Sequence, residues 1–203
     1  MLPVAARRGF RQCPDALDPI WGEKVDSRPV GRDAEIADIR AFLSATSQAP
    51  AALAITGDAG IGKTMVWKQV VQASGSSAEV LSCQPTRAER PLAFSALSDL
   101  FGDVAEQVLP ALPDPRRRAV QDAFQRGTSP GPWPAGLSEV RRASPERQVL
   151  ARGVLDALRA LSADASLVIA VDDVQRLDRP SASVLEFCLR LGRKTRRPAA
   201  PSA

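Results

Sequence analysis

The sequence predicts an α/β domain built around a parallel sheet, and three observations support this. The chain has 203 residues, of which 44% are hydrophobic and 25% charged, a composition typical of one globular domain. Short apolar runs alternate along the chain with longer segments of helical periodicity. Strands that alternate with helices form parallel sheets, because each helix carries the chain back across the sheet. Only 4% of the residues are aromatic, so the core is expected to be aliphatic.

Three apolar runs are short enough to be buried strands. They are residues 51–56, ended by Gly57, residues 80–83, ended by Pro85, and residues 167–171, which are followed by Asp172. Between and around them, apolar residues recur at the spacing of a helix face. The predicted helices are 31–45, 63–73, 92–101, 115–126, 146–161 and 181–191.

The ends of the chain and one internal stretch differ in composition from the rest. Residues 1–28 are interrupted by prolines and charges, and we interpret them as an irregular lead-in to a domain spanning 29–192. Prolines and glycines dominate the start of 127–144, which predicts a flexible loop. Residues 193–203 are basic and are expected to be a disordered tail.

Composition also excludes several classes of site. The chain has no His, which excludes Ser-His-Asp and Cys-His catalysis and zinc sites with His ligands. Its three cysteines lie far apart, which argues against a disulfide framework and favours a reducing compartment. No apolar run approaches the length of a bilayer span, and the N-terminus lacks the apolar core of a signal peptide. We therefore expect a cytoplasmic protein with no membrane association.

The net charge of +4 is concentrated near the C-terminus. Five cations follow Glu186 with no acid among them, and the rest of the chain is close to neutral. A dispersed basic surface for nucleic acid is therefore not indicated.

The first predicted strand is followed by a glycine-rich segment that matches G-x-x-x-x-G-K-[ST] in full. Glycines let such a loop wrap closely, so that several backbone N–H groups converge on phosphate oxygens. The helix that follows directs the positive end of its dipole at the same phosphates. The lysine of the motif reaches the β- and γ-phosphates, and the hydroxyl of the final Ser or Thr coordinates Mg²⁺. The predicted nucleotide-binding residues are Gly57, Asp58, Ala59, Gly60, Ile61, Gly62, Lys63 and Thr64, with Thr64 also a metal ligand.

A second acidic element follows the last predicted strand. Asp172 and Asp173 come directly after the apolar run 167–171. Opposite a phosphate-binding loop, Asp172 is expected to hold Mg²⁺ and Asp173 to orient or deprotonate an attacking water. Two aspartates after a strand are by themselves common loop or cap residues, so this assignment depends on the upstream motif.

Taken together, three segments resemble the ATPase domain of large ATP-binding LuxR-family regulators, and more broadly the signal-transduction and origin-recognition AAA domains. They are VGRDAEI at 30–36, GDAGIGKT at 57–64 and LVIAVDDVQRLD at 167–178. The segment ERPLAFSALSDLF at 89–101 is similar to a stretch that those regulators carry after their second strand. The resemblance covers about residues 28–192.

This resemblance implies a P-loop NTPase three-layer sandwich with a parallel sheet. It also implies an ATP and Mg²⁺ site, with Val30 and Gly31 on its adenine side, and a regulatory switch driven by nucleotide binding. In proteins of this family the strands of the sheet have the order 5-1-4-3-2. No fourth strand can be found in this sequence, so the sheet is expected to be incomplete at its C-terminal side. The first and third strands would then either pair directly or leave a gap.

Several functions remain open at this stage. We expect ATP binding, with hydrolysis weak or absent, because no sensor residue or arginine finger is identified. The resemblance implies a truncated regulator, so self-association or the missing C-terminal regulator domains are the expected partners, and the chain alone is not expected to bind DNA. The alternatives are a small-molecule kinase, which would close arginines from 116–152 over the phosphates, and a degenerate interaction module without nucleotide turnover. A GTPase is disfavoured, because the chain has no Asn for an N-K-x-D motif.

Overall fold

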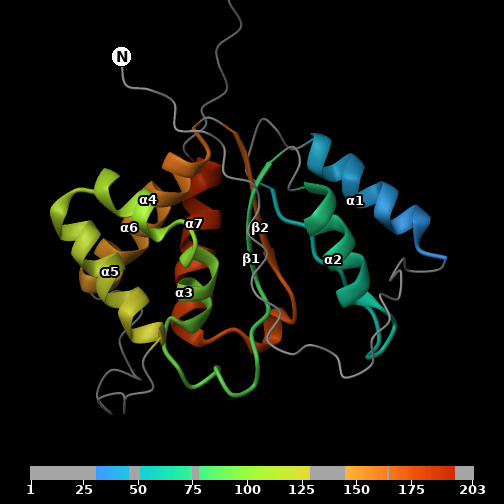
Figure 1. Cartoon of the computed structure of the whole chain (residues 1–203), viewed down its shortest axis with the longest axis horizontal. Coiled ribbons are helices and arrows are strands. Elements are labelled where there is room, and N and C mark those ends of the chain that lie inside the picture. Colours follow the sequence, from blue (N-terminus) through green and yellow to red (C-terminus); the bar gives the residue numbers. More distant parts are fainter. Residues whose placement is uncertain (1–30, 46–50, 75–77, 129–144, 164, 195–203) are drawn as a thin grey trace, which may run out of the picture.

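The computed structural model describes residues 31–45, 51–74, 78–128, 145–163 and 165–194 (Figure 1). The longer helices are α1 (Asp33–Ala45), α2 (Lys63–Ser74), α3 (Ser95–Phe101), α5 (Asp114–Thr128), α6 (Pro145–Leu161) and α7 (Arg179–Lys194). The strands are β1 (Ala78–Cys83) and β2 (Ser166–Val171). A short helix α4 (Ala105–Val108) and two 3-10 turns, η2 (Leu109–Ala111) and η3 (Val174–Arg176), complete the described elements.

The sheet in the described part of the chain is two-stranded and parallel, which confirms the predicted α/β class. Ala78 lies opposite Ser166, and the register runs without a break to Cys83 opposite Val171. Helices α1 and α2 lie on one side of the strands, while α3, α5, α6 and α7 lie on the other (Figure 1). Over the described residues, the layering is that of a P-loop NTPase with an incomplete sheet.

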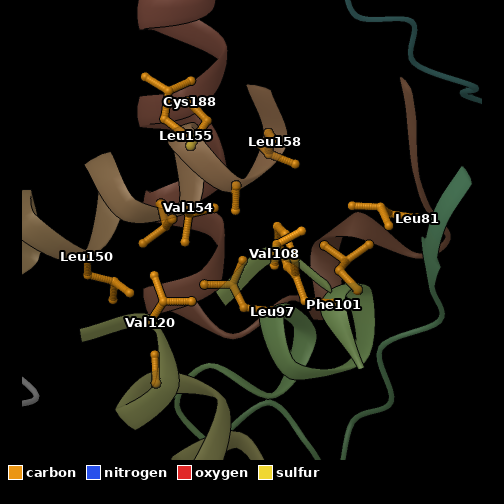
Figure 2. Packing of buried hydrophobic residues seen from close by; sticks show 14 of the residues in the cluster. Leu81, Leu97, Phe101, Val108, Val120, Leu150, Val154, Leu155, Leu158 and Cys188 are labelled. Carbon is orange, nitrogen blue, oxygen red and sulfur yellow. The ribbon is translucent and has the colours of Figure 1, made fainter. Parts of the chain in front are cut away.

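The main core fills the space between the strands and the larger helical layer. As the low aromatic content predicts, it is mostly aliphatic, although Phe101 is fully buried and stacks on Phe124 at a centroid distance of 5.3 Å. Figure 2 shows Leu97, Val120 and Val154 converging from three helices. A separate small cluster joins α1 to α2 and consists of Ile36, Ile39, Val66 and Val70.

The prediction of a strand at 51–56 is wrong. No strand is assigned there, and the segment is exposed, with 49% of Leu53 and 38% of Ile55 accessible to solvent. A strand needs a neighbour to accept and donate its backbone hydrogen bonds, and among the described residues neither β1 nor β2 pairs with 51–56. Of the two outcomes expected for an incomplete sheet, direct pairing of 51–56 with β2 is therefore not the one observed.

The remaining element predictions are confirmed with small shifts of their ends. The second and third predicted strands correspond to β1 and β2, and every predicted helix is present. Helix α5 continues through Thr128, so the first two residues of the predicted 127–144 loop are helical. The lead-in 1–28, residues 129–144 of that loop and residues 195–203 of the predicted tail lie outside the described residues.

Candidate functional site

The glycine-rich segment 57–62, which leads into α2, forms a loop that only glycine permits at its turning points. Gly60 and Gly62 have φ angles of +81° and +95°, which residues with a Cβ rarely adopt. A Cβ at either position would meet no atom within 4 Å, so the requirement comes from backbone conformation rather than from crowding. This loop is hereafter called the P-loop.

Helix α2 begins at Lys63, directly after the P-loop. The N–H groups of Met65 and Val66 both donate to the carbonyl of Gly62, at 3.1 and 3.2 Å. The first N–H groups of an α-helix have no acceptor inside the helix, and they carry the positive end of its dipole. The start of α2 therefore presents backbone donors that suit an anion.

The Lys63 side chain folds back over the P-loop. Its ammonium donates to the carbonyl of Gly57 at 3.0 Å and to that of Asp58 at 2.7 Å. These weak neutral acceptors hold the cation where a phosphate, with its full charge, would be a stronger partner. Lys63 and Thr64 are half-buried and residues 57–60 are exposed, so a ligand can reach the loop from solvent.

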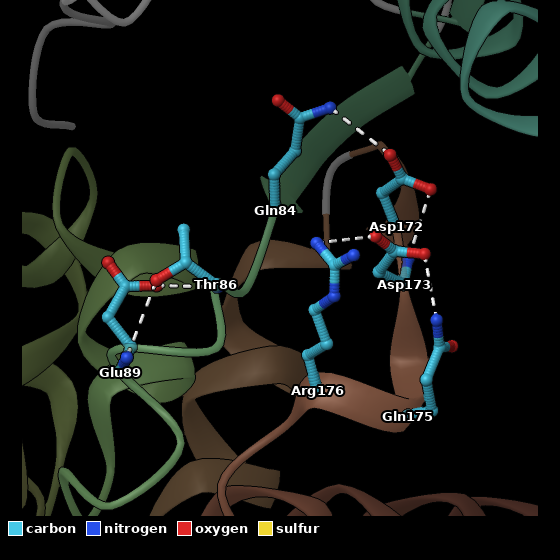
Figure 3. A network of polar contacts seen from close by, with 7 residues as sticks. All are labelled: Gln84, Thr86, Glu89, Asp172, Asp173, Gln175 and Arg176. Atoms are coloured by element: carbon cyan, nitrogen blue, oxygen red, sulfur yellow. Dashed lines mark hydrogen bonds and ion pairs between the residues drawn. The ribbon is translucent and has the colours of Figure 1, made fainter.

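The acidic pair lies at the end of β2. Asp172 donates its backbone N–H to the carbonyl of Cys83 at 3.1 Å, which extends the ladder one residue beyond the strands. Its carboxylate accepts from the Gln84 amide at 3.4 Å and from the N–H of Asp173 at 3.0 Å (Figure 3). The carboxyl end of β1 therefore supplies a polar neighbour to the carboxylate at the end of β2.

Asp173 has a left-handed backbone, with φ of +46°. Its carboxylate forms an ion pair with Arg176 at 2.8 Å and accepts from the Gln175 amide at 2.8 Å (Figure 3). An attacking water would have to share this carboxylate with both groups. Sequence reasoning missed Arg176 and Gln84. The i, i+3 charge spacing of Asp173 and Arg176 and the place of Gln84 at a strand end are signals that could have found them.

The segment that follows β1 is shaped by its own polar contacts and by Asp178. Thr86 and Glu89 bond each other reciprocally: the Thr86 N–H donates to the Glu89 carboxylate at 2.7 Å, and the Glu89 N–H donates to the Thr86 hydroxyl at 3.4 Å (Figure 3). The buried Asp178 carboxylate accepts the N–H of Phe94 at 2.9 Å. The chain after β1 is thus tied to the chain after β2.

The titration behaviour of this region reflects its burial. Desolvation raises the pKa of the Cys83 thiol to about 12, with further contributions from Asp99, Asp178 and Glu89. Burial first, and then Glu89 and Asp178, raise the pKa of Asp99 above its ordinary value. Cys83 is therefore a protonated thiol at neutral pH and is not a nucleophile.

The structure brings some of the predicted site residues together and leaves others apart. The P-loop and the carboxyl ends of β1 and β2 lie at the same end of the molecule, the lower end in Figure 1. Within the described residues, no hydrogen bond or ion pair joins the P-loop to Asp172 or Asp173. Gly31 lies just before α1 with φ of +73°, and Val30 lies outside the described residues.

The residues present fit a nucleotide with Mg²⁺ in their chemistry. The P-loop offers backbone donors and an ammonium for phosphate, and Thr64 and Asp172 offer the oxygen ligands that Mg²⁺ prefers. No cluster of three or more His, Cys, Asp or Glu side chains arranged for a metal occurs among the described residues. Mg²⁺ in phosphate sites needs only one or two protein ligands besides phosphate and water.

The comparisons with known proteins place this loop in a family context. The profile of the AAA ATPase domain matches residues 28–199, which is most of the chain. No curated protein and no solved structure matches the chain. In the described part of the chain, no helix has both the length and the apolar character needed to cross a membrane.

Proposed function

The chain belongs to the AAA ATPase domain family, and we propose that it binds ATP with Mg²⁺ and acts as a nucleotide-dependent regulatory switch. The observation that carries this proposal is the P-loop conformation: left-handed glycines lead into α2, and the Lys63 ammonium lies over the loop. A regulator of the LuxR type is the specific form that the sequence resemblance favours.

In this proposal the P-loop residues and the start of α2 hold the phosphates, and Val30 and Gly31 lie on the adenine side. Thr64 and Asp172 hold Mg²⁺, which neutralises phosphate charge when bound. Asp173 is the group that would orient or deprotonate water. Its existing pairing with Arg176 and Gln175 supports weak hydrolysis, since an attacking water would have to compete with these two donors for the carboxylate oxygens.

A thermal melt with and without Mg·ATP tests the binding site. A ligand that binds only the folded state stabilises it by about 2.7 kcal/mol at a hundredfold excess over Kd. We expect Mg·ATP to raise the Tm of the wild type and of Lys68→Ala, but not that of Lys63→Ala. Lys68 is the matched control, because it is an exposed lysine on the same helix. An equal Tm shift in wild type and Lys63→Ala would contradict the proposal.

Replacing the proposed metal ligands separates Mg²⁺ from ATP. Thr64→Ala and Asp172→Asn should reduce the extra stabilisation that Mg²⁺ adds to ATP, while ATP alone should still bind. A Mg²⁺ effect that is unchanged in both variants would remove these two residues from the proposed metal site.

A degenerate interaction module is the second candidate, and one observation favours it. The segment 51–56, which precedes the P-loop, is exposed and unpaired, so the P-loop lacks the sheet support that the sequence predicted. A broad melting transition that ignores ATP, together with an unchanged regulatory output in Lys63→Ala, would favour this candidate. Phosphate transfer from ATP to a metabolite would instead favour a small-molecule kinase.

A further inference from the structure

Arg32, the arginine of the VGR segment and the residue directly before α1, reaches the P-loop. One of its guanidinium nitrogens donates to the carbonyl of Ile61 at 3.0 Å. The other is paired with the Glu35 carboxylate at 2.6 Å. One arginine therefore fixes a backbone carbonyl of the P-loop and is itself held in place from the first turn of α1.

The carbonyl that Arg32 binds belongs to the peptide between Ile61 and Gly62. In a planar trans peptide, the C=O and the N–H point in opposite directions, and no cis peptide occurs among the described residues. Holding the Ile61 carbonyl toward Arg32 therefore turns the Gly62 N–H away from Arg32. Gly62 has a φ of +95° and can rotate into many conformations, so this peptide has little intrinsic restraint.

We propose that Arg32 is a positioning residue for nucleotide binding, because it orients the Ile61–Gly62 peptide so that the Gly62 N–H is available to phosphate. This inference rests on the proposed function. A peptide that is already oriented loses less conformational freedom when the ligand binds, which raises affinity without any new contact. Glu35 serves the same end, because it fixes the guanidinium that fixes the carbonyl.

The surroundings of Arg32 favour an effect on binding over an effect on folding. Arg32 and Glu35 are at the surface, and surface ion pairs contribute little to stability. The attachment of α1 to α2 comes from the apolar cluster of Ile36, Ile39, Val66 and Val70, which the substitution of Arg32 leaves intact.

The test measures Kd for Mg·ATP and Mg·ADP by calorimetry, beside the Tm of the ligand-free protein, in wild type, Arg32→Ala, Arg32→Lys and Arg40→Ala. Arg40 is the matched control, an exposed arginine in α1, the helix that directly follows Arg32, so it reports any general effect of removing a positive charge. We expect Arg32→Ala to raise both Kd values about tenfold with little change in Tm. Arg32→Lys keeps the charge and one donor and should restore most of the affinity, and Arg40→Ala should match the wild type.

The amide resonance of Gly62 gives a readout that a merely structural role would not move. The downfield shift that Mg·ATP induces in this amide should be lost in Arg32→Ala and kept in Arg40→Ala.

The outcomes separate this inference from the proposed function. A wild type that binds neither nucleotide overturns both. A wild type that binds, with Arg32→Ala binding equally well or with an unchanged Gly62 shift, overturns only the role of Arg32. If Arg32→Ala does not fold, Arg32→Lys carries the test. A folded Arg32→Lys variant that binds Mg·ATP much more weakly than the wild type and Arg40→Ala would show that a donor and a positive charge at this position do not orient the peptide.

Discussion

Replacing Asp178 should destabilise the fold more than replacing any exposed carboxylate. The Asp178 side chain is only 1% exposed and accepts four hydrogen bonds. One carboxylate oxygen accepts the N–H groups of Phe94 at 2.9 Å and Ser181 at 2.8 Å. The other accepts the Ala96 N–H at 3.2 Å and the Ser95 hydroxyl at 3.3 Å. Asp178 thus caps α7 and holds the chain that enters α3.

The magnitude follows from the donors that would be left without acceptors. Asp178→Ala leaves three buried or half-buried backbone N–H groups without their acceptor. Each loss costs about 1–3 kcal/mol, and less where a water molecule enters and accepts the bond. Phe94 also has a φ of +68°, a conformation that costs about 1 kcal/mol and is held in part by its bond to Asp178. We expect Asp178→Ala to lower the free energy of unfolding by about 4 kcal/mol.

Asp178→Asn gives a graded second measurement. Its amide oxygen can replace the oxygen that serves Phe94 and Ser181, but its NH₂ group then faces the Ala96 N–H. One donor instead of three is lost, so we expect a cost of about 2 kcal/mol.

Urea denaturation with linear extrapolation measures these values, with Asp103→Ala as the control for an exposed aspartate. Equal losses in Asp178→Ala and Asp103→Ala, or in the Ala and Asn variants, would refute the reasoning.

Two further predictions concern buried thiols and close helix packing. Burial raises the pKa of Cys83 and Cys188 to about 12. The unfolded chain therefore releases two protons above pH 9 that the folded chain retains, and the free energy of unfolding should fall as pH rises from about 9 toward 12. Mass spectrometry after alkylation at pH 8 should find both thiols unmodified until urea unfolds the chain, and rapid native labelling of either would contradict their burial. At Gly127 in α5, a Cβ would lie 2.6 Å from the Phe94 carbonyl oxygen, so Gly127→Ala should destabilise by about 1–3 kcal/mol despite its better helix propensity. Gly102→Ala, whose Cβ would come no nearer than 3.3 Å to another atom, should be close to neutral by the same urea assay, and equal effects would show that the close contact relaxes.

Local signals were sufficient to predict the helices, two strands and the P-loop. Periodicity placed α6 and α2 within a residue of their observed bounds. Apolar residues repeated at helical spacing are typical of a helix that buries one face and of few other structures. The place of the P-loop in the chain was predictable because its glycines stand at fixed spacings before Lys63 and Thr64.

The prediction failed where structure depends on a neighbour. Residues 51–56 have the apolar character of a buried strand, but a strand exists only when another strand completes its hydrogen bonds, and a single sequence cannot show whether that partner is present. The Arg32 and Asp178 contacts were unpredictable for a related reason. The Arg32 contact joins residues 29 positions apart in the sequence, and the Asp178 contact with Phe94 joins residues 84 positions apart. Which residues meet over such separations is decided by the packing of the whole fold.

The P-loop and the acidic pair at the end of β2 belong to parts of the molecule with separate hydrophobic clusters. The P-loop leads into α2, which packs on α1 through the small cluster of Ile36, Ile39, Val66 and Val70. Asp172 and Asp173 instead follow β2, which packs against the main core. A segment with few buried contacts opens more easily than the core it is attached to. A ligand that contacts both the P-loop and Asp172 would therefore stabilise chiefly the less stable part and reduce its motion relative to the main core. Nucleotide binding and the ordering of α1 and α2 would then be linked, and such a linkage is the physical requirement for the switch proposed above.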